Sequence, residues 1–295
     1  MFYAILKAMF RHFLAGLLLF LLSACVAPPV ATPIPPSTPT AISIPLATFT
    51  PTPAPPITTL TATPRPTATP TPIVQFWQPL FPGAEVAQTD DGLTMLRHAA
   101  SLVRYNAWFE NDPEKVQLVS DFLLQSDQAR AAINCGFYWD NDGAFVHMGL
   151  LAVMDKQWAP VRANWGAAFI VREGNASLVR HPSKKQPPMT FGIQGWPTLL
   201  WQGRIIKDLD DVDVARRTAV GIDASGRVVW VVDPAGSTLQ AFAKRLLQED
   251  VGLVNAVNLD GGSSTGLMWR QMPDEEPQGV DSFPIPCAVM LAPLK

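Results

Sequence analysis

A long run of proline and threonine limits how much of this chain can fold. Residues 26–72 hold 15 of the 29 prolines, and Arg65 is the one charged residue among them. A segment with so few large apolar side chains cannot bury a core, so we expect it to be disordered. In polyproline II conformation, at about 3.1 Å per residue, it could extend roughly 140 Å. Residues 25–72 are therefore predicted to be a tether, and residues 73–295 a single folded domain.

The N-terminus has the pattern of a secretory leader. Lys7 and Arg11 precede an apolar run at residues 13–22, which is too short to span a bilayer, and small residues stand directly before Cys25. Residues 1–24 are thus predicted to be a signal peptide. The small residues before the cysteine resemble the bacterial lipobox, which implies that Cys25 becomes a lipidated N-terminus. We expect an extracytoplasmic protein that is attached to the cell membrane by this lipid.

The predicted domain is mildly acidic. Lys7, Arg11 and Arg65 precede residue 73 and no acidic residue does, which leaves 19 basic against 25 acidic residues, or a formal charge of −6. A protein that binds nucleic acid normally carries a basic surface. We therefore expect no nucleic-acid partner.

Two cysteines lie within the predicted domain. Cys135 and Cys287 are 152 positions apart, so nothing local in the sequence forces them together. Exported proteins more often bridge such a pair than leave it free. The sequence leaves a possible Cys135–Cys287 disulfide open.

Secondary-structure patterns favour strands joined by turns, with two helices. A helix is expected after Asp112 with Val119 and Phe122 on its apolar face, and a second after a Thr238 cap. Apolar runs predict strands at residues 102–109, 131–138, 149–154, 167–171, 198–201, 218–222, 228–232 and 254–259. The expected fold is α+β: a single domain with a mixed or largely antiparallel sheet and two main helices.

The stretch with the most evident site chemistry is 255–266. A predicted buried strand leads directly into Asp260, Gly261 and Gly262, and hydroxyl residues follow. Glycines allow backbone conformations in which consecutive N–H groups converge on an anion. Asp-Gly is also a favoured pair for a hairpin turn, with residues 267–269 as the returning strand. Local sequence alone favours that hairpin turn.

Other polar residues stand at the ends of predicted strands. Asn134 and Gly136 end one strand, where the alternative is a structural bulge, and Arg217 opens another, where the alternative is a solvated surface arginine. Acidic residues at 208–213 and 140–143 could bind a hard cation, but the sequence favours a solvated loop or turn for both, since the second lacks the remaining ligands of a calcium loop. The sequence requires no cofactor and leaves metal use open.

The order of these segments resembles that of the phosphodiester glycosidase family. The resemblance rests on residues 132–138, 148–150, 195–203, 217–222, 239–243 and 258–265. It implies cleavage between the anomeric carbon of a sugar and a phosphate, with Asp260, Asn134 and Arg217 as catalytic residues. The substrate or phosphate would be bound by Gly136, Thr218, Gly261, Gly262, Ser263 and Ser264. Cys135, Tyr138 and Ser263 depart from the residues that the family often has.

Two hypotheses of function follow. The first is hydrolysis of a sugar-phosphate phosphodiester at the glycosidic bond, in an extracellular or cell-envelope glycan such as an exopolysaccharide. A carboxylate at Asp260 would suit the positive charge of a glycosyl transition state. The alternative is a surface lipoprotein that binds glycans without cleaving them. A cleft that unites Asn134, Arg217 and Asp260 would favour the enzyme.

Overall fold

The computed structural model describes residues 76–154 and 156–294, which belong to the compact unit that begins at Thr69. The predicted leader, Cys25 and the tether lie outside these residues. Every strand pair in the described chain is antiparallel. None of the helices within it has the length and apolar character needed to cross a membrane.

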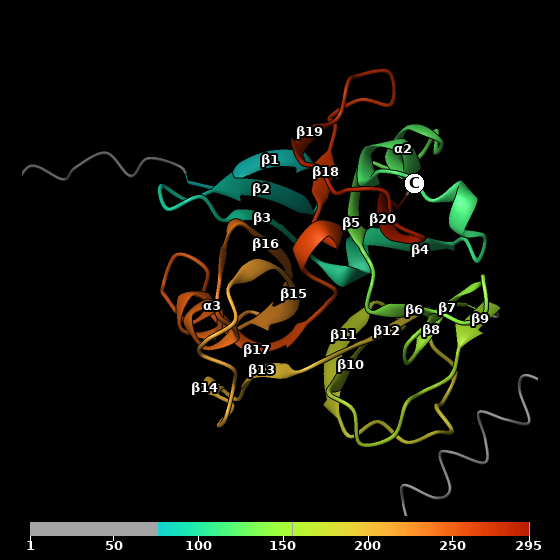
Figure 1. Ribbon diagram of the computed structural model, residues 1–295. Coiled ribbons are helices and arrows are strands. Elements are labelled where there is room, and N and C mark those ends of the chain that lie inside the picture. The colour runs from blue at the N-terminus through green and yellow to red at the C-terminus, as the bar shows by residue number, and fades with distance from the viewer. Residues whose placement is uncertain (1–75, 155, 295) are drawn as a thin grey trace, which may run out of the picture. The chain divides into compact units, whose positions relative to one another are not determined.

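The strands form three larger sheets and one small one (Figure 1). The eight-stranded sheet has the order β1 (Gln78–Phe81), β2 (Ala84–Gln88), β3 (Thr94–His98), β16 (Val228–Ser237), β15 (Ala215–Asp223), β17 (Leu253–Asn258), β13 (Thr198–Trp201), β14 (Arg204–Ile205). One five-stranded sheet has the order β11 (Asn175–Arg180), β10 (Ala167–Arg172), β12 (Phe191–Gly195), β8 (Leu151–Val153), β9 (Lys156–Ala159). The other has the order β19 (Gln278–Val280), β18 (Leu267–Trp269), β5 (Ala131–Asn134), β20 (Cys287–Pro293), β4 (Val103–Phe109). β6 (Tyr138–Asp140) and β7 (Phe145–His147) pair with each other.

Helices are few and short. α2 (Val119–Leu124) has six residues and α3 (Leu239–Leu246) has eight. Three short 3-10 turns complete the set: η1 (Ala100–Leu102), η2 (Pro113–Lys115) and η3 (Gly262–Ser264). α3 begins where the sequence predicts, because the Thr238 hydroxyl accepts a hydrogen bond from the N–H of Ala241 at 3.1 Å.

The predicted α+β fold class is wrong, because the described chain is mostly antiparallel β-structure. The helix expected after Asp112 is reduced to η2 and the short α2. Between them, Gln117 pairs with Ile285 through two backbone hydrogen bonds, of 3.0 and 2.7 Å, which hold this segment extended. Residues 78–98, to which the sequence patterns assign no structure, add three strands.

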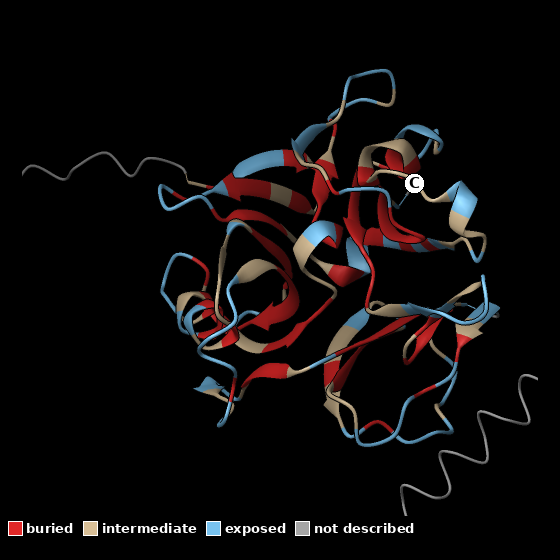
Figure 2. Ribbon diagram, in the orientation of Figure 1, coloured by how far each residue is buried: buried red, intermediate tan, exposed pale blue. Residues whose placement is uncertain are grey.

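The three larger sheets share one core. Leu96 and Trp230 of the eight-stranded sheet pack in the same buried cluster as Ile133 and Phe169 of the two five-stranded sheets. Figure 2 shows the buried parts of the strands in red and the exposed loops around them in pale blue. α3 covers the other face of the eight-stranded sheet, where Phe242 packs among buried apolar residues, and α2 covers one face of the sheet that contains β5. The ends of strands from different sheets therefore meet, and the candidate site lies at one such meeting point.

Candidate active site

The segment from Leu259 to Gly266 crosses from one sheet to another. β17 ends in the eight-stranded sheet, whereas β18 pairs with β5 and β19. The N–H of Leu259 donates to the Thr218 carbonyl at 2.8 Å, and the N–H of Asp260 donates to the Cys135 carbonyl at 3.2 Å. The hairpin-turn interpretation of Asp260-Gly261-Gly262 is therefore wrong, since β18 does not return beside β17. We call residues 259–266 the crossover loop.

Each glycine of this loop is required for a different reason. A Cβ on Gly261 would lie 2.7 Å from the Arg216 carbonyl oxygen, so any side chain there would force the two backbones apart. Gly262 has a φ of 60°, a left-handed conformation that favours glycine. The loop then turns through η3, where the N–H of Ser264 donates to the Gly261 carbonyl at 3.1 Å. Within the described residues the N–H groups of Gly262 and Ser263 have no acceptor, so they remain free donors next to Asp260.

Asn134, at the end of β5, holds the crossover loop in place. Its Nδ2 donates to the carbonyl oxygens of Cys135 and Asp260, at 3.1 and 2.8 Å. Its Oδ1 accepts from the Thr218 hydroxyl at 2.9 Å and from the N–H of Gly266 at 3.1 Å. All four hydrogen-bonding positions of this amide are occupied within the protein. Asn134 is thus a positioning residue that fixes the backbone of Asp260.

We expect Asn134→Ala to lower the free energy of unfolding by about 2–4 kcal/mol, because it removes the hydrogen bonds of one amide to four protein groups. Urea denaturation of wild type and variant measures the difference. Asn175→Ala is the matched control, since Asn175 is exposed in β11 and its amide bonds only to the nearby Glu173 carbonyl. A loss no larger than that of the control would show that the amide network is unimportant.

Asp260 is a largely buried carboxylate. Burial raises its pKa from 3.8 to about 6, and hydrogen bonds from the Ser264 hydroxyl and the Gly261 N–H offset part of that effect. The Gly261 N–H donates to Oδ1 at 2.9 Å. Burial also raises the pKa of Tyr138, and the nearby charge of Asp260 raises it further. A hydrogen bond with Ser264 offsets part of this increase. A phenol, a hydroxyl and a carboxylate therefore share one environment, and such perturbed carboxylates are frequent at active sites.

The two neighbouring arginines of β15 have different partners, at a point where the register of β15 against β16 shifts. Arg216 Nη2 donates to the carbonyl oxygens of Thr265 and Asp281, at 2.8 and 3.1 Å, so this side chain lies against the crossover loop. Arg217 donates through Nε to the Ser237 carbonyl at 2.8 Å and through Nη2 to the Asp213 carbonyl. Neither guanidinium forms an ion pair with a described carboxylate.

Buried polar atoms without a partner concentrate around the crossover loop. Three of the six such atoms among the described residues belong to Arg216 (Nε), Asn258 (Oδ1) and Thr265 (Oγ1). A fourth, Nε2 of His147, would lie 3.2 Å from a Cβ placed on Gly136. Burying an unpaired polar group costs about 1–3 kcal/mol, so such groups are rare unless a ligand pairs with them. Three of them belong to the crossover loop or to residues that adjoin it, which makes this region a candidate binding site.

The structure thus brings together most of the residues that the sequence predicts. Asn134, Thr218, Asp260, Gly261 and Ser264 are joined by hydrogen bonds, and Gly262 and Ser263 follow in the same loop. Gly136 is packed against the Gln194 carbonyl rather than open to a ligand. The hydrogen-bond partners of Arg217 lie outside the crossover loop. Arg216, which contacts the loop, was not among the site residues predicted from the sequence. The sequence carries no signal that distinguishes Arg216 from Arg217, because the register of β15 is irregular between Ala215 and Arg217.

The two acidic segments that the sequence offered as cation sites, residues 140–143 and 208–213, form turns in the structure. The Asp140 carboxylate accepts from the N–H of Gly143 at 2.8 Å, and that of Asp210 accepts from the N–H of Val212 at 2.9 Å. Among the described residues no three His, Cys, Asp or Glu side chains are grouped so that they could hold a metal ion. Burial lowers the pKa of His147 to about 4, so its ring is neutral at physiological pH.

Sequence comparison identifies the class of protein. The Phosphodiester glycosidase family matches residues 127–292, which is more than half of the chain, and the crossover loop and Asn134 fall within the matched region. The chain belongs to the phosphodiester glycosidase family. No protein of curated function matches the sequence significantly.

Two solved structures share the fold. The catalytic domain of zebrafish N-acetylglucosamine-1-phosphodiester alpha-N-acetylglucosaminidase, in a form auto-inhibited by its pro-peptide, has a TM-score of 0.52 and 20% identity, over 72% of this chain and 82% of that one. A hypothetical protein from Synechocystis has a TM-score of 0.50 and 14% identity, over 72% of this chain. This chain covers 62% of the Synechocystis protein. At these identities the likeness establishes the fold alone.

Proposed function

We propose that this chain hydrolyses a sugar-phosphate phosphodiester at the glycosidic bond, in an extracellular or cell-envelope glycan. The observation that carries the proposal is the buried carboxylate of Asp260, with its pKa near 6, directly followed by the two free N–H groups of Gly262 and Ser263. A carboxylate suits the oxocarbenium-like sugar, and free N–H groups suit the phosphate that leaves it.

The bond changes are those of a hydrolysis. The bond between the anomeric carbon and the bridging oxygen breaks, its electron pair stays with the phosphate, and a water oxygen becomes bonded to the anomeric carbon. One water proton stays on the new sugar hydroxyl, and the other passes to the departing phosphate or to solvent. Asp260 stabilises the developing positive charge in its ionised form. A phosphate monoester is a far better leaving group than an alkoxide, so the reaction needs little help from a general acid.

The remaining residues bind and position. In this proposal the N–H groups of Gly262 and Ser263, the Ser264 hydroxyl and the Arg216 guanidinium bind the phosphate. Asn134 and Thr218 fix the loop that carries Asp260, through the hydrogen bonds of the Asn134 amide.

The cellular location is part of the same proposal. The sequence before residue 25 predicts export and lipid attachment at Cys25, so the substrate would be met outside the cytoplasm. The Cys135–Cys287 disulfide supports this location, because such bonds persist in oxidising compartments.

The direct test is turnover of sugar-1-phosphate p-nitrophenyl diesters, with N-acetylglucosamine included among the sugars because of the zebrafish relative. Cleavage at the glycosidic bond releases p-nitrophenyl phosphate, which yields colour only after a phosphatase is added. We expect colour that depends on the phosphatase. Colour without phosphatase would mean cleavage at phosphorus. No turnover combined with binding of the same glycans would favour the non-catalytic alternative.

Two lysine substitutions distinguish the proposed roles of Arg216 and Arg217. We expect Arg216→Lys to raise KM for the diester about tenfold, because lysine loses the planar fork that matches a phosphate. Arg217→Lys should change KM less than about twofold and instead lower the free energy of unfolding by about 1 kcal/mol, since its two acceptors lie outside the loop. Steady-state kinetics and thermal melts of both variants decide the matter. If Arg217→Lys is the variant that raises KM, the phosphate fork is Arg217, as the sequence predicts.

A further inference from the structure

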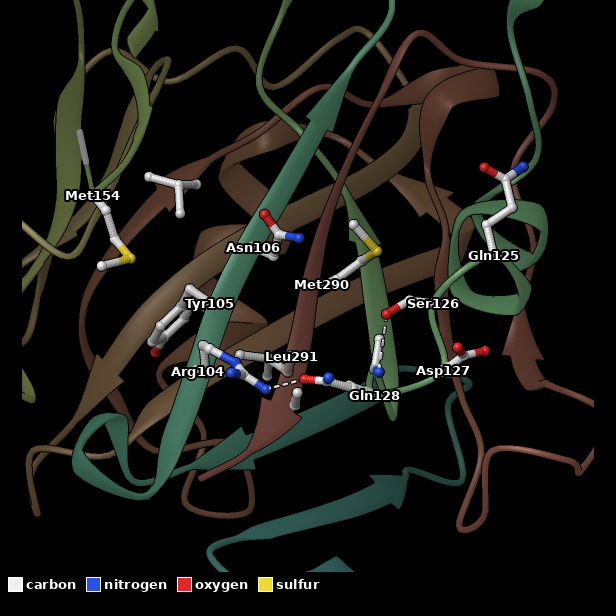
Figure 3. A pocket seen from close by; sticks show the side chains of 13 residues that line it. Arg104, Tyr105, Asn106, Gln125, Ser126, Asp127, Gln128, Met154, Met290 and Leu291 are labelled. Atoms are coloured by element: carbon white, nitrogen blue, oxygen red, sulfur yellow. Dashed lines mark hydrogen bonds between the residues drawn. The ribbon is translucent and has the colours of Figure 1, made fainter. Parts of the chain in front are cut away.

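A groove of about 470 Å³ lies on the sheet that contains β5, away from the crossover loop (Figure 3). Its floor is formed by the neighbouring strands β4 and β20, which contribute Asn106 and Met290. One wall is the segment that follows α2, and Met154 lies on the opposite side. Figure 3 shows the hydrogen bond from Arg104 to Gln128 that closes one end.

The groove presents amides whose hydrogen-bonding groups are only partly used by residues 76–154 and 156–294. Asn106 Oδ1 accepts from the N–H of Ala107 at 2.9 Å, which leaves Nδ2 as a free donor. Gln125 Nε2 donates to Gln117 Oε1 at 2.6 Å, which leaves Oε1 of Gln125 as a free acceptor. Gln128 accepts from Arg104 through Oε1, which leaves its Nε2 free. The lining of the groove thus offers both donors and an acceptor, and sugar hydroxyl groups act as both.

An aromatic side chain continues this surface beyond the groove. Arg104, Asn106 and Trp108 are the outward-facing residues of β4, spaced about 6.8 Å apart at every second position. We call these three residues the β4 strip. Trp108 is 50% exposed, so about half of its surface is open to solvent. An exposed indole next to amides provides a flat apolar surface for a sugar ring and polar groups for its hydroxyls.

The strand register relates this strip to the candidate active site. Trp108 pairs with Ala288, and Ala288 pairs with Asn134 on the next strand. Side chains of directly paired residues point to the same face, so Trp108 and Asn134 lie on one face of the sheet, two strands and about 10 Å apart. The β4 strip therefore runs from the groove toward the level at which Asn134 holds Asp260.

We propose that the β4 strip and its groove bind neutral sugar units of a glycan chain at a distance from the bond that is cleaved. The charges favour neutral sugars, because the guanidinium of Arg104 is accompanied by the carboxylate of Asp127 in the same lining. A proline-rich peptide fits less well, since prolines supply no N–H donors for the free acceptor of Gln125. The choice of a glycan rests in part on the proposed function.

The test measures binding without turnover. Full-length protein carrying Asp260→Asn is titrated calorimetrically with phosphate-free hexasaccharides of glucose, mannose and N-acetylglucosamine. We expect at least one to bind, Trp108→Ala to weaken it about tenfold, and Asn106→Ala to weaken it about threefold. The matched control is Trp139→Ala, because Trp139 is a similarly exposed tryptophan, 56% exposed on β6, and lies outside both the β4 strip and the groove. We expect a change of less than about twofold for it.

Three outcomes would overturn the proposal. The first is that no hexasaccharide binds, and the second is that Trp108→Ala and Asn106→Ala bind the sugar with the affinity of the parent protein. The third is that a synthetic peptide of residues 26–72 binds the groove while the sugars do not. Thermal melts establish that the variants are folded. The measurement is independent of hydrolysis. If the protein hydrolyses phosphodiesters but binds no sugar at the β4 strip, only this inference is contradicted. If the protein binds sugars through the β4 strip but hydrolyses no phosphodiester, only the proposed function is contradicted.

Discussion

Asp260→Asn is expected to lower kcat for sugar-1-phosphodiesters by at least about 10²-fold while the fold stays intact. Asparagine keeps the shape of the side chain but removes the negative charge that would face the sugar in the transition state. Steady-state kinetics of wild type and variant measure the effect. The control is Asp142→Asn, since Asp142 is exposed in the turn between β6 and β7. If Asp260→Asn turns over like wild type, the carboxylate has no catalytic role.

The same substitution should make the protein more stable at neutral pH. Burial holds the pKa of Asp260 near 6, above its ordinary 3.8, so the folded state binds this proton more tightly than the unfolded state does. The resulting stability is fully present below pH 4 and is lost as the pH rises through 6. Asp260→Asn avoids that loss, and we expect it to raise the free energy of unfolding at pH 7 by up to about 3 kcal/mol. The gain should vanish near pH 4, and urea titrations at both pH values measure it.

Removal of the disulfide has the second large expected effect. Cys135 and Cys287 are bridged, with their Cα atoms 5.4 Å apart, and the Cys135 carbonyl accepts the N–H of Asp260. We expect Cys135→Ala/Cys287→Ala to lower the free energy of unfolding by about 2–4 kcal/mol. We also expect it to reduce kcat, because the backbone that holds Asp260 loses support.

Two measurements check the bridge. Urea denaturation compares the double variant with wild type, and thiol counting on the unfolded, unreduced protein reports the state of the cysteines. Intact protein should show no free thiols other than any at Cys25. Two additional thiols would contradict the bridge, and an unchanged unfolding midpoint in the double variant would show that it contributes no stability.

The sequence predicted those parts of the fold that depend on local interactions. The Thr238 cap and the apolar face of α3 are encoded within the cap residue and the eight residues of the helix, and the predicted strand at 102–109 matches β4. The prediction of a helix directly after Asp112 was wrong around Gln117, because Gln117 pairs with Ile285, more than 160 positions away. A tertiary pairing of this kind overrides local helical preference and leaves no local signal.

The candidate site was likewise predictable from the sequence only where local interactions determine it. The composition of Asp260-Gly261-Gly262 indicated site chemistry, but the local pattern favoured a hairpin. Whether the loop turns back or crosses over depends on whether β18 pairs with β17 or with β5, and strand pairing between distant segments is invisible in a short window. The role of Asn134 was hidden for the same reason, because its partners Thr218 and Gly266 are distant in sequence.

The choice between Arg216 and Arg217 was not open to sequence reasoning. The register of β15 against β16 shifts between Ala215 and Arg217, so the regular alternation of side chains cannot be counted back from Thr218 to Arg216. The resemblance to the family directed attention to Arg217. The structure gives each arginine its own set of carbonyl partners, and the lysine substitutions described above test which of them binds phosphate.

The position of bond cleavage tests the central claim most directly. Hydrolysis of a sugar-1-phosphodiester is run in ¹⁸O-labelled water, and the phosphomonoester product is examined by ³¹P NMR, in which each bound ¹⁸O shifts the resonance. Attack at the anomeric carbon leaves the bridging oxygen on phosphorus, so we predict a phosphomonoester that contains no ¹⁸O. A phosphomonoester that carries one ¹⁸O atom would show that water attacks phosphorus and would contradict a glycosidase mechanism.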